Sequence, residues 1–237
     1  MNYFVGLSLV FIVGCSLGWL LELFFRRIVH KKWINPGFLV GPCLPLYGTG
    51  LTFLYLVSSI NLSFISSEIV RAIVVILLLG ILMTLVEYIT GLVFIKKMKV
   101  KLWDYSSRPG NIQGIICPLF SFFWLVIAAI YYLFIHKYIV HITDFINNYP
   151  IYAYFVGMYF GVMGVDVFYS FQIVSKIRAW AKANNYVIKY EELKESIRAK
   201  AIALKQKRHF IFSFKTKNGI DAELEHYKEN IQNIIKK

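Results

Sequence analysis

The stretch Asn35–Gly50 reads NPGFLVGPCLPLYGTG, and the interpretation of the whole chain depends on it. It contains three prolines and four glycines, and it joins the basic run Arg26–Lys32 to the apolar run Leu51–Ile60. An interior proline removes a backbone hydrogen bond and clashes with the preceding turn, so this stretch cannot form an uninterrupted helix. Two interpretations are open: a kinked start to an ordinary membrane-spanning helix, or a broken helix that lines a site.

The composition is typical of a membrane protein. Hydrophobic residues make up 58% of the 237 residues and charged residues only 16%, which is far from the balance of a soluble domain. Apolar runs of about 20 residues can cross a bilayer as helices. No positive region precedes the first run and no small-residue cleavage site follows it, so we expect a retained span. The sequence predicts five spans: Tyr3–Phe25, Phe38–Ile60, Ile69–Ile95, Ile112–Ile135 and Ile151–Val174.

The lysines and arginines of the connections predict the orientation. The first connection carries four of them between Arg26 and Lys32, and the third carries five between Lys96 and Arg108, whereas the second and fourth carry one each. Positive loops stay in the cytoplasm. We therefore expect an all-α, polytopic protein of the plasma membrane with five spans, N-out and C-in. Residues 1–174 would form the transmembrane domain, and residues 175–237 a basic cytoplasmic tail that is partly helical.

Three acidic residues lie inside the predicted spans. Glu22 could pair with Arg26, one helical turn further on. Glu87 precedes Ile95 by eight residues, which places it about 12 Å inside the end of its span. A carboxylate at that depth costs at least about 2.5 kcal/mol unless it is paired or hydrated. Asp166 lies past the midpoint of the fifth span, where a tyrosine or a neighbouring helix could satisfy it.

We expect the three acids to face one wet, cytoplasm-facing vestibule that holds a polar or cationic substrate, with Glu87 as the main contact. The stretch Asn35–Gly50 and the third connection, where Asp104 and Arg108 are close enough to pair, would close it. The alternative role is snorkelling or pairing with Arg26 for Glu22, and a structural ion pair for Glu87. Asp166 could instead be satisfied by a tyrosine such as Tyr169 or by a neighbouring helix. We expect no catalytic residue, no metal ligand and no cofactor. The candidate substrate-binding residues are Glu87, Glu22, Asp166, Asn35, Tyr47, Asp104, Arg108 and Asn111.

The two turn-rich stretches suggest a weak internal repeat. In each, an acid near the end of a span is followed by a tryptophan, an asparagine–glycine turn and a proline. A parallel duplication of a two-helix hairpin would place two helix N-termini, with their partial positive charge, on the cytoplasmic side. The matching positions are Glu22, Trp33, Asn35, Gly37 and Pro42 in the first copy, and Glu87, Trp103, Asn111, Gly114 and Pro118 in the second.

The predicted tail differs from the rest of the chain in composition, since it holds 15 Lys and Arg against seven Asp and Glu. The pattern over Tyr190–Arg208 predicts an amphipathic helix, and the spacing from Ile220 to Ile234 indicates a short coiled-coil seam. His209–Phe214 could be a short strand or an interfacial anchor. Basic amphipathic segments beside a membrane contact anionic lipid. We therefore expect lipid binding or association into a homo-oligomer, and no nucleic-acid partner.

Four motifs carry a resemblance to a known family. GWLLE (Gly18–Glu22), NPGFLVGPCLPLYG (Asn35–Gly48), LVEYITG (Leu85–Gly91) and WDYSSRPGNIQGIICP (Trp103–Pro118) resemble the motifs of the putative ABC transporter permease family (type IV, CmpB-like). They cover about the first half of the chain, and the tail lies outside them. The resemblance implies a bacterial integral membrane protein grouped with ABC permeases.

Three function classes are open at this point. The first is a transport component, which would need a separate ATPase subunit because the chain has no G-x-x-x-x-G-K-[ST] loop of its own. The second is a membrane-embedded enzyme that acts on a lipid-linked substrate, with Glu22, Glu87 or Asp104 in acid–base roles. The third is a membrane scaffold whose tail recruits partners. We favour the transport component.

Overall fold

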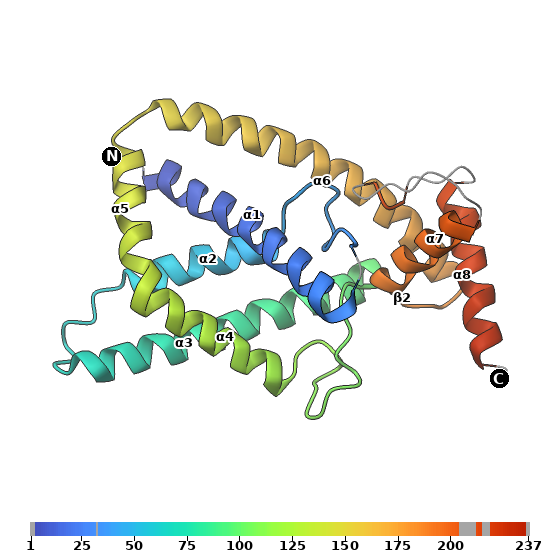
Figure 1. The fold of residues 1–237 in the computed structure, drawn as a ribbon, viewed down its shortest axis with the longest axis horizontal. Helices are drawn as coiled ribbons and strands as arrows, with labels where there is room; N and C mark the ends of the chain where they lie inside the picture. Colours follow the sequence, from blue (N-terminus) through green and yellow to red (C-terminus); the bar gives the residue numbers. More distant parts are fainter. Residues whose placement is uncertain (1–2, 32, 204–211, 215–218, 236–237) are drawn as a thin grey trace. The chain divides into compact units, whose positions relative to one another are not determined.

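The structure is a computed structural model, and it describes all residues except 1–2, 32, 204–211, 215–218 and 236–237. Within the described residues the chain is mostly helical, with two short strands (Figure 1). The elements are α1 (Tyr3–His30), α2 (Pro45–Ser58), α3 (Glu68–Val93), the π-helix η1 (Phe94–Met98), β1 (Val100–Lys101), α4 (Pro118–Ile130), the π-helix η2 (Tyr131–Ile135), α5 (His136–Asn147), α6 (Ile151–Ala183), β2 (Ile188–Lys189), α7 (Tyr190–Ala203) and α8 (Gly219–Ile235).

Four helices of the described chain are long and apolar enough to cross a membrane. They run over Tyr3–Val29, Glu68–Met98, Pro118–Asn147 and Ile151–Ala183. The second continues from α3 into η1, and the third from α4 through η2 into α5. The loop predicted after Ile135 is therefore helical up to Asn147. These helices confirm the prediction of an all-α membrane protein.

The second predicted span, Phe38–Ile60, is helical only from Pro45 to Ser58. Proline suits the first helical turn because the N–H that it lacks would have no partner inside the helix. Before it the backbone is non-helical, and Gly37 has a positive φ of 83°, a conformation that glycine adopts without strain. The 14 residues of α2 cover about 21 Å, less than the roughly 30 Å of a hydrocarbon core. The predicted span is therefore non-helical backbone followed by a short helix, and we refer to this combination as the broken helix.

The chain divides into two compact units, which we describe separately. Unit 1 comprises Met1–Trp19, Cys43–Thr90 and Tyr105–Val162, and unit 2 comprises Leu20–Pro42, Gly91–Asp104 and Met163–Lys237. The sequence of unit 1 holds three Lys and Arg and three Asp and Glu. That of unit 2 holds 23 Lys and Arg against 10 Asp and Glu, so this unit carries the whole net charge of +13.

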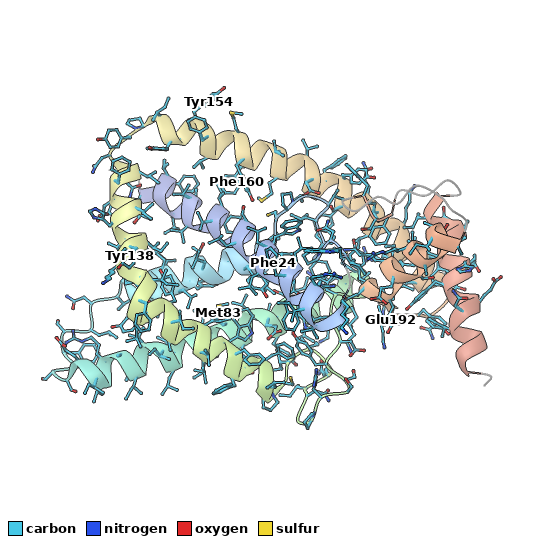
Figure 2. The ribbon with its side chains drawn as sticks, in the orientation of Figure 1. Phe24, Met83, Tyr138, Tyr154, Phe160 and Glu192 are labelled. Atoms are coloured by element: carbon cyan, nitrogen blue, oxygen red, sulfur yellow. The ribbon has the colours of Figure 1, made fainter. Side chains whose placement is uncertain are left out.

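The core of unit 1 joins α2, α3, α4 and η2. Its central side chains are Leu54, Val75, Leu79, Ala128 and Tyr131. Glycines let the helices approach closely around this core. A Cβ atom on Gly18 would lie 2.3 Å from the Cβ atom of Tyr47, and one on Gly50 would lie 2.4 Å from Cε of Met83. Met83 is labelled on α3 in Figure 2.

The core of unit 2 contains much of the predicted tail. Val174, Ile177 and Ala181 of α6 pack with Val100 of β1 and with the apolar faces of α7 and α8. The strands β1 and β2 pair in parallel, with Val100 opposite Ile188. The buried residues that α7 and α8 contribute are Tyr190, Leu193, Ile197, Ile220, Leu224 and Tyr227.

The predicted tail contains the expected amphipathic helix, but its other two segments differ from the prediction or lie partly outside the described residues. The predicted amphipathic helix is present as α7, with Leu193 and Ile197 buried on one face, whereas Leu204 lies outside the described residues. The face of α8 assigned to a coiled-coil seam packs into the core of unit 2 through Ile220 and Leu224. Of the segment predicted as a strand or anchor, 209–211 lies outside the described residues, and 212–214 is not a strand.

Candidate functional site

Glu87 is a buried carboxylate in the membrane-length helix α3 of unit 1. Its side chain is only 4% exposed. The phenol Oη of Tyr105 donates to Oε1 at 3.0 Å, and the indole Nε1 of Trp124 donates to Oε2 at 2.9 Å. Both of these donors are neutral, and they come from the segment before α4 and from α4 itself. Glu87 therefore links three parts of unit 1 through a single carboxylate.

Each of the two side chains that donate to this carboxylate also packs against a second aromatic ring. The ring of Tyr105 stacks on that of Phe120 with 4.3 Å between centroids. The indole of Trp124 lies against the ring of Tyr47 at 5.9 Å. Tyr47, a residue predicted for the site, thus joins the cluster around Glu87 through Trp124. We call Glu87, Tyr105, Trp124, Tyr47 and Phe120 the Glu87 cluster.

Asn111 and Arg108, two more predicted site residues, form the turn that carries Tyr105. The Asn111 side chain donates to the carbonyl of Arg108 at 2.8 Å and accepts from the N–H of Gly114 at 2.9 Å. The N–H of Tyr105 in turn donates to the carbonyl of Gly114 at 2.8 Å. The asparagine–glycine turn thus fixes the backbone on which Tyr105 reaches Glu87.

Asp166 on α6 is the second intramembrane carboxylate, and it belongs to unit 2. It accepts hydrogen bonds from the backbone N–H groups of Val40 at 2.9 Å and Gly41 at 2.7 Å, and from the hydroxyl of Ser170 at 3.1 Å. A Cβ atom on Gly41 would lie 2.9 Å from Oδ2 of Asp166. Asp166 therefore binds the backbone of the non-helical stretch before α2.

Asn35 lies in the same non-helical stretch and is 2% exposed. Its side-chain amide donates to the carbonyl of Val40 at 2.7 Å and more weakly to that of Leu39 at 3.4 Å. Its own carbonyl accepts from Nζ of Lys194 at 3.1 Å. Asn35 thus fixes a loop in its own backbone, because a side-chain amide takes the place of helical hydrogen bonds.

The two other predicted site acids of unit 2, Glu22 and Asp104, form ion pairs. Glu22 pairs with Arg26, one turn further along α1, at 3.2 Å, and Arg26 also pairs with Glu191 of α7. Asp104 pairs with Lys101 at 2.6 Å and with Lys189 at 3.2 Å. Pairing with Arg26 was the alternative role of Glu22 in the sequence, and this contact favours it. The contacts of Asp104 are with two lysines, and its expected pairing with Arg108 stays a prediction.

The structure thus groups the predicted residues by unit. Glu87, Tyr47, Arg108 and Asn111 belong to unit 1, whereas Glu22, Asp166, Asn35 and Asp104 belong to unit 2. A vestibule shared by Glu22, Glu87 and Asp166 stays a prediction.

The sequence interpretation missed three residues that the contacts single out. Tyr105 and Trp124 hold Glu87, and Lys194 holds Asn35. A signal existed for Trp124, since a buried indole N–H in an apolar helix needs an acceptor and Glu87 is the nearest acid along the chain that lies inside a predicted span. Lys194 gave no such signal, because it is one of many lysines in the tail.

Comparison with known proteins places the chain in a family. The model of the family described as putative ABC-transporter type IV matches residues 9–171, which include all eight predicted site residues and exclude α7 and α8. No curated protein and no solved structure matches the chain. Because the match covers more than half of a chain with four membrane-length helices, this membrane protein belongs to the putative ABC-transporter type IV family.

Proposed function

We propose that the chain is the membrane-embedded component of a bacterial transporter that works with a separate ATPase subunit, and that Glu87 contacts the transported solute. The observation that carries the proposal is the Glu87 cluster. A carboxylate buried in a membrane-length helix is expensive to retain, and such residues typically mark solute or ion pathways. The family to which the chain belongs is consistent with this role.

The surroundings of Glu87 favour a polar or cationic solute. A carboxylate provides negative charge, and the faces of tryptophan and tyrosine attract cations within about 6 Å of the ring centroid. Trp124, Tyr105 and Tyr47 supply such faces in the cluster. An arriving cation could take over one oxygen of Glu87, because the hydroxyl of Tyr105 can rotate away.

We infer that the non-helical stretch and α2 together form a fifth crossing of the plasma membrane, with the N-terminus outside. The 14 residues of α2 cover about 21 Å, and residues 38–44 can add the remaining distance at up to about 3.3 Å per residue. A crossing here puts both basic connections, Arg26–Lys32 and Lys96–Arg108, on the cytoplasmic side. Broken helices of this kind occur in transporters, where they line the binding site.

Reporter fusions test this topology. Fusions after Asn61 should report an external position, and fusions after Lys99 and Lys217 a cytoplasmic one. A cytoplasmic report at Asn61 would show that residues 38–58 do not cross the membrane.

Purification from native membranes tests the proposed function itself. We expect an ATPase to co-purify in stoichiometric amount. Cells whose growth depends on the protein should grow less well when it carries Glu87→Gln. Glu68→Gln is the matched control, since Glu68 is an exposed acid in the first turn of the same helix. Wild-type growth with Glu87→Gln would contradict the role of Glu87. Co-purification with enzymes of lipid synthesis, and with no ATPase, would favour a membrane-embedded enzyme instead.

A further inference from the structure

One face of α7 binds the non-helical stretch through a regular series of hydrogen bonds. Arg198 donates to the carbonyl of Trp33 at 2.6 Å, and Tyr190 to that of Phe38 at 3.4 Å. Between them, Nζ of Lys194 donates to the carbonyls of Asn35 at 3.1 Å and Gly37 at 2.7 Å. All these residues belong to unit 2.

The spacing of this series explains how a helix can hold an irregular backbone. Tyr190, Lys194 and Arg198 follow one another at intervals of four, so they lie on one face of α7. Their acceptors run in the opposite order along residues 33–38, so the helix and the stretch are antiparallel. Backbone carbonyls without helical partners need other donors when they are buried. The three side chains of α7 supply them.

Further contacts attach the same face of α7 to unit 2. Glu191 pairs with Arg26 of α1, and Phe38 packs against the apolar core that contains Leu193 and Ile197. Glu192 of α7, which is labelled in Figure 2, accepts a hydrogen bond from Tyr227 of α8 at 3.1 Å. The helix is thus bound on both sides, and Lys194 lies at the centre of its contact with residues 33–38.

Lys194 is an unusual residue for such a central place. It is 6% exposed, and its Nζ lies 4.7 Å from the ring centroid of Tyr190 and 5.9 Å from that of Phe214. Burial, and then the charge of Arg26, lower the pKa of Lys194 to about 7, whereas Glu191 acts in the opposite direction. A neutral amine has two N–H groups, which match the two carbonyls that it binds.

Other charged and titratable groups surround this contact. Arg26 of α1 forms an ion pair with Glu191 of α7. Burial, and then the charge of Asp166 on α6, raise the pKa of Tyr190. Hydrogen bonds that Lys189 donates to Glu192 and then to Asp104 raise the pKa of this lysine. Among the groups with a shifted pKa at this contact, Lys194 is the one whose pKa moves toward neutral pH.

We propose that α7 is a reversible latch on residues 33–41, closed while Lys194 is a neutral amine and released when this side chain takes up a proton. Release would free the carbonyls of residues 33–38 and leave the N–H groups of Val40 and Gly41 bound to Asp166. The latch would thus make the conformation of the broken helix depend on cytoplasmic pH. The inference goes beyond the proposed transport function and does not depend on the identity of the solute.

The direction of the pH effect follows from linkage. The released lysine has an ordinary pKa of about 10.5, and the docked lysine one of about 7. Between these values the released state binds more protons, so a falling pH favours release. The docking constant of α7 should fall about 50-fold from pH 9 to pH 7 and only about twofold more from pH 7 to pH 6.

Hydrogen exchange of the full-length protein in detergent measures this constant. Protection factors for the amides of α7, corrected for the intrinsic exchange rate at each pH, should show the expected 50-fold change. Protection in α3 should not change, which controls for the detergent and for global opening. A protection factor of α7 that is constant between pH 9 and pH 7 would overturn the proposal.

Two variants show whether Lys194 is the titrating group. Lys194→Arg keeps a donor that is charged at every pH, and Lys194→Met removes both the donor and the charge. Both should abolish the pH dependence between pH 7 and pH 9. If Lys194→Met removes the protection of the α7 amides from exchange at every pH, the test rests on Lys194→Arg. A wild-type pH dependence that persists in the variants would show that Lys194 has only a structural role and would overturn the proposal.

Discussion

Units 1 and 2 each carry a hydrogen-bonded carboxylate on a membrane-length helix, buried at Glu87 and half-buried at Asp166, but they satisfy it in different ways. Glu87 in unit 1 accepts from two side chains, the phenol of Tyr105 and the indole of Trp124. Asp166 in unit 2 accepts from two backbone N–H groups and from Ser170. A hydroxyl can reverse its role from donor to acceptor, whereas a backbone N–H can only donate. Tyr105 and Ser170 can thus each rotate away or reverse their roles. Both oxygens of Asp166 also bind backbone N–H groups, however, whereas the other donor to Glu87 is the side chain of Trp124.

The distribution of charge shows the same contrast. Unit 1 has no net charge, and its buried acid lies among aromatic rings, in surroundings that suit the binding of a solute. Unit 2 carries +13. In it Glu22 and Asp104 form ion pairs, and Asp166 accepts hydrogen bonds from two backbone N–H groups and from Ser170. We therefore propose a functional role for Glu87 and structural roles for Asp166, Glu22 and Asp104. In this proposal the chemistry of an acid's partners distinguishes the roles, and its depth in a membrane helix does not.

Deletion of Lys189–Lys237 should have the largest effect on this contrast. The deletion removes α7 and α8, including the buried Tyr190, Leu193 and Leu224, each worth about 1.5–3 kcal/mol of burial. Their sum is comparable to the whole stability of a typical domain, about 5–15 kcal/mol. Unit 2 should therefore lose its fold, whereas the helices of unit 1 should remain inserted. Limited proteolysis of membranes measures both outcomes.

A shorter deletion controls for the loss of chain length. Removal of Gly219–Lys237 takes away α8 but keeps the contacts of α7 with residues 33–38. This variant should lose less protection in unit 2 than the longer deletion does. Equal resistance of unit 2 in the wild type and in the longer deletion would show that the tail is not part of the unit. In that case it would act as a separate attachment to anionic lipid.

Much of the architecture could be predicted from the sequence, because apolar runs of helical length are a strong signal. The break before α2 was also readable, since Pro36, Pro42 and Pro45 exclude a continuous helix. The length of α2 was overestimated because residues 38–44 are apolar and hydropathy does not distinguish an apolar loop from a helix. The loop predicted after Ile135 proved to be helical for a related reason, because polar residues such as Thr143 and Asp144 end a hydropathic run without ending a helix.

The candidate site was predictable only in part. Single acids such as Glu87 and Asp166 are conspicuous in an apolar run, so they could be named from the sequence. Their partners could not, because Tyr105, Trp124 and the N–H groups of Val40 and Gly41 meet them only through the tertiary fold. The tail was the least predictable region. Its net charge suggested a lipid-binding segment, whereas its apolar face packs into unit 2 and Lys194 is buried.

The most direct test of the account compares the thermal stability of two variants, Glu87→Gln and Asp166→Asn, in the purified full-length protein. Glutamine can accept from Trp124 and donate to the hydroxyl of Tyr105, so Glu87→Gln should leave the Tm within about 2 °C of the wild type. Asparagine has only one side-chain oxygen, so it cannot accept from the N–H groups of both Val40 and Gly41 through two oxygens, as Asp166 does. Asp166→Asn should therefore cost about 1–3 kcal/mol and lower the Tm by about 2–10 °C. A larger loss for Glu87→Gln than for Asp166→Asn would contradict the assignment of function to Glu87 and structure to Asp166.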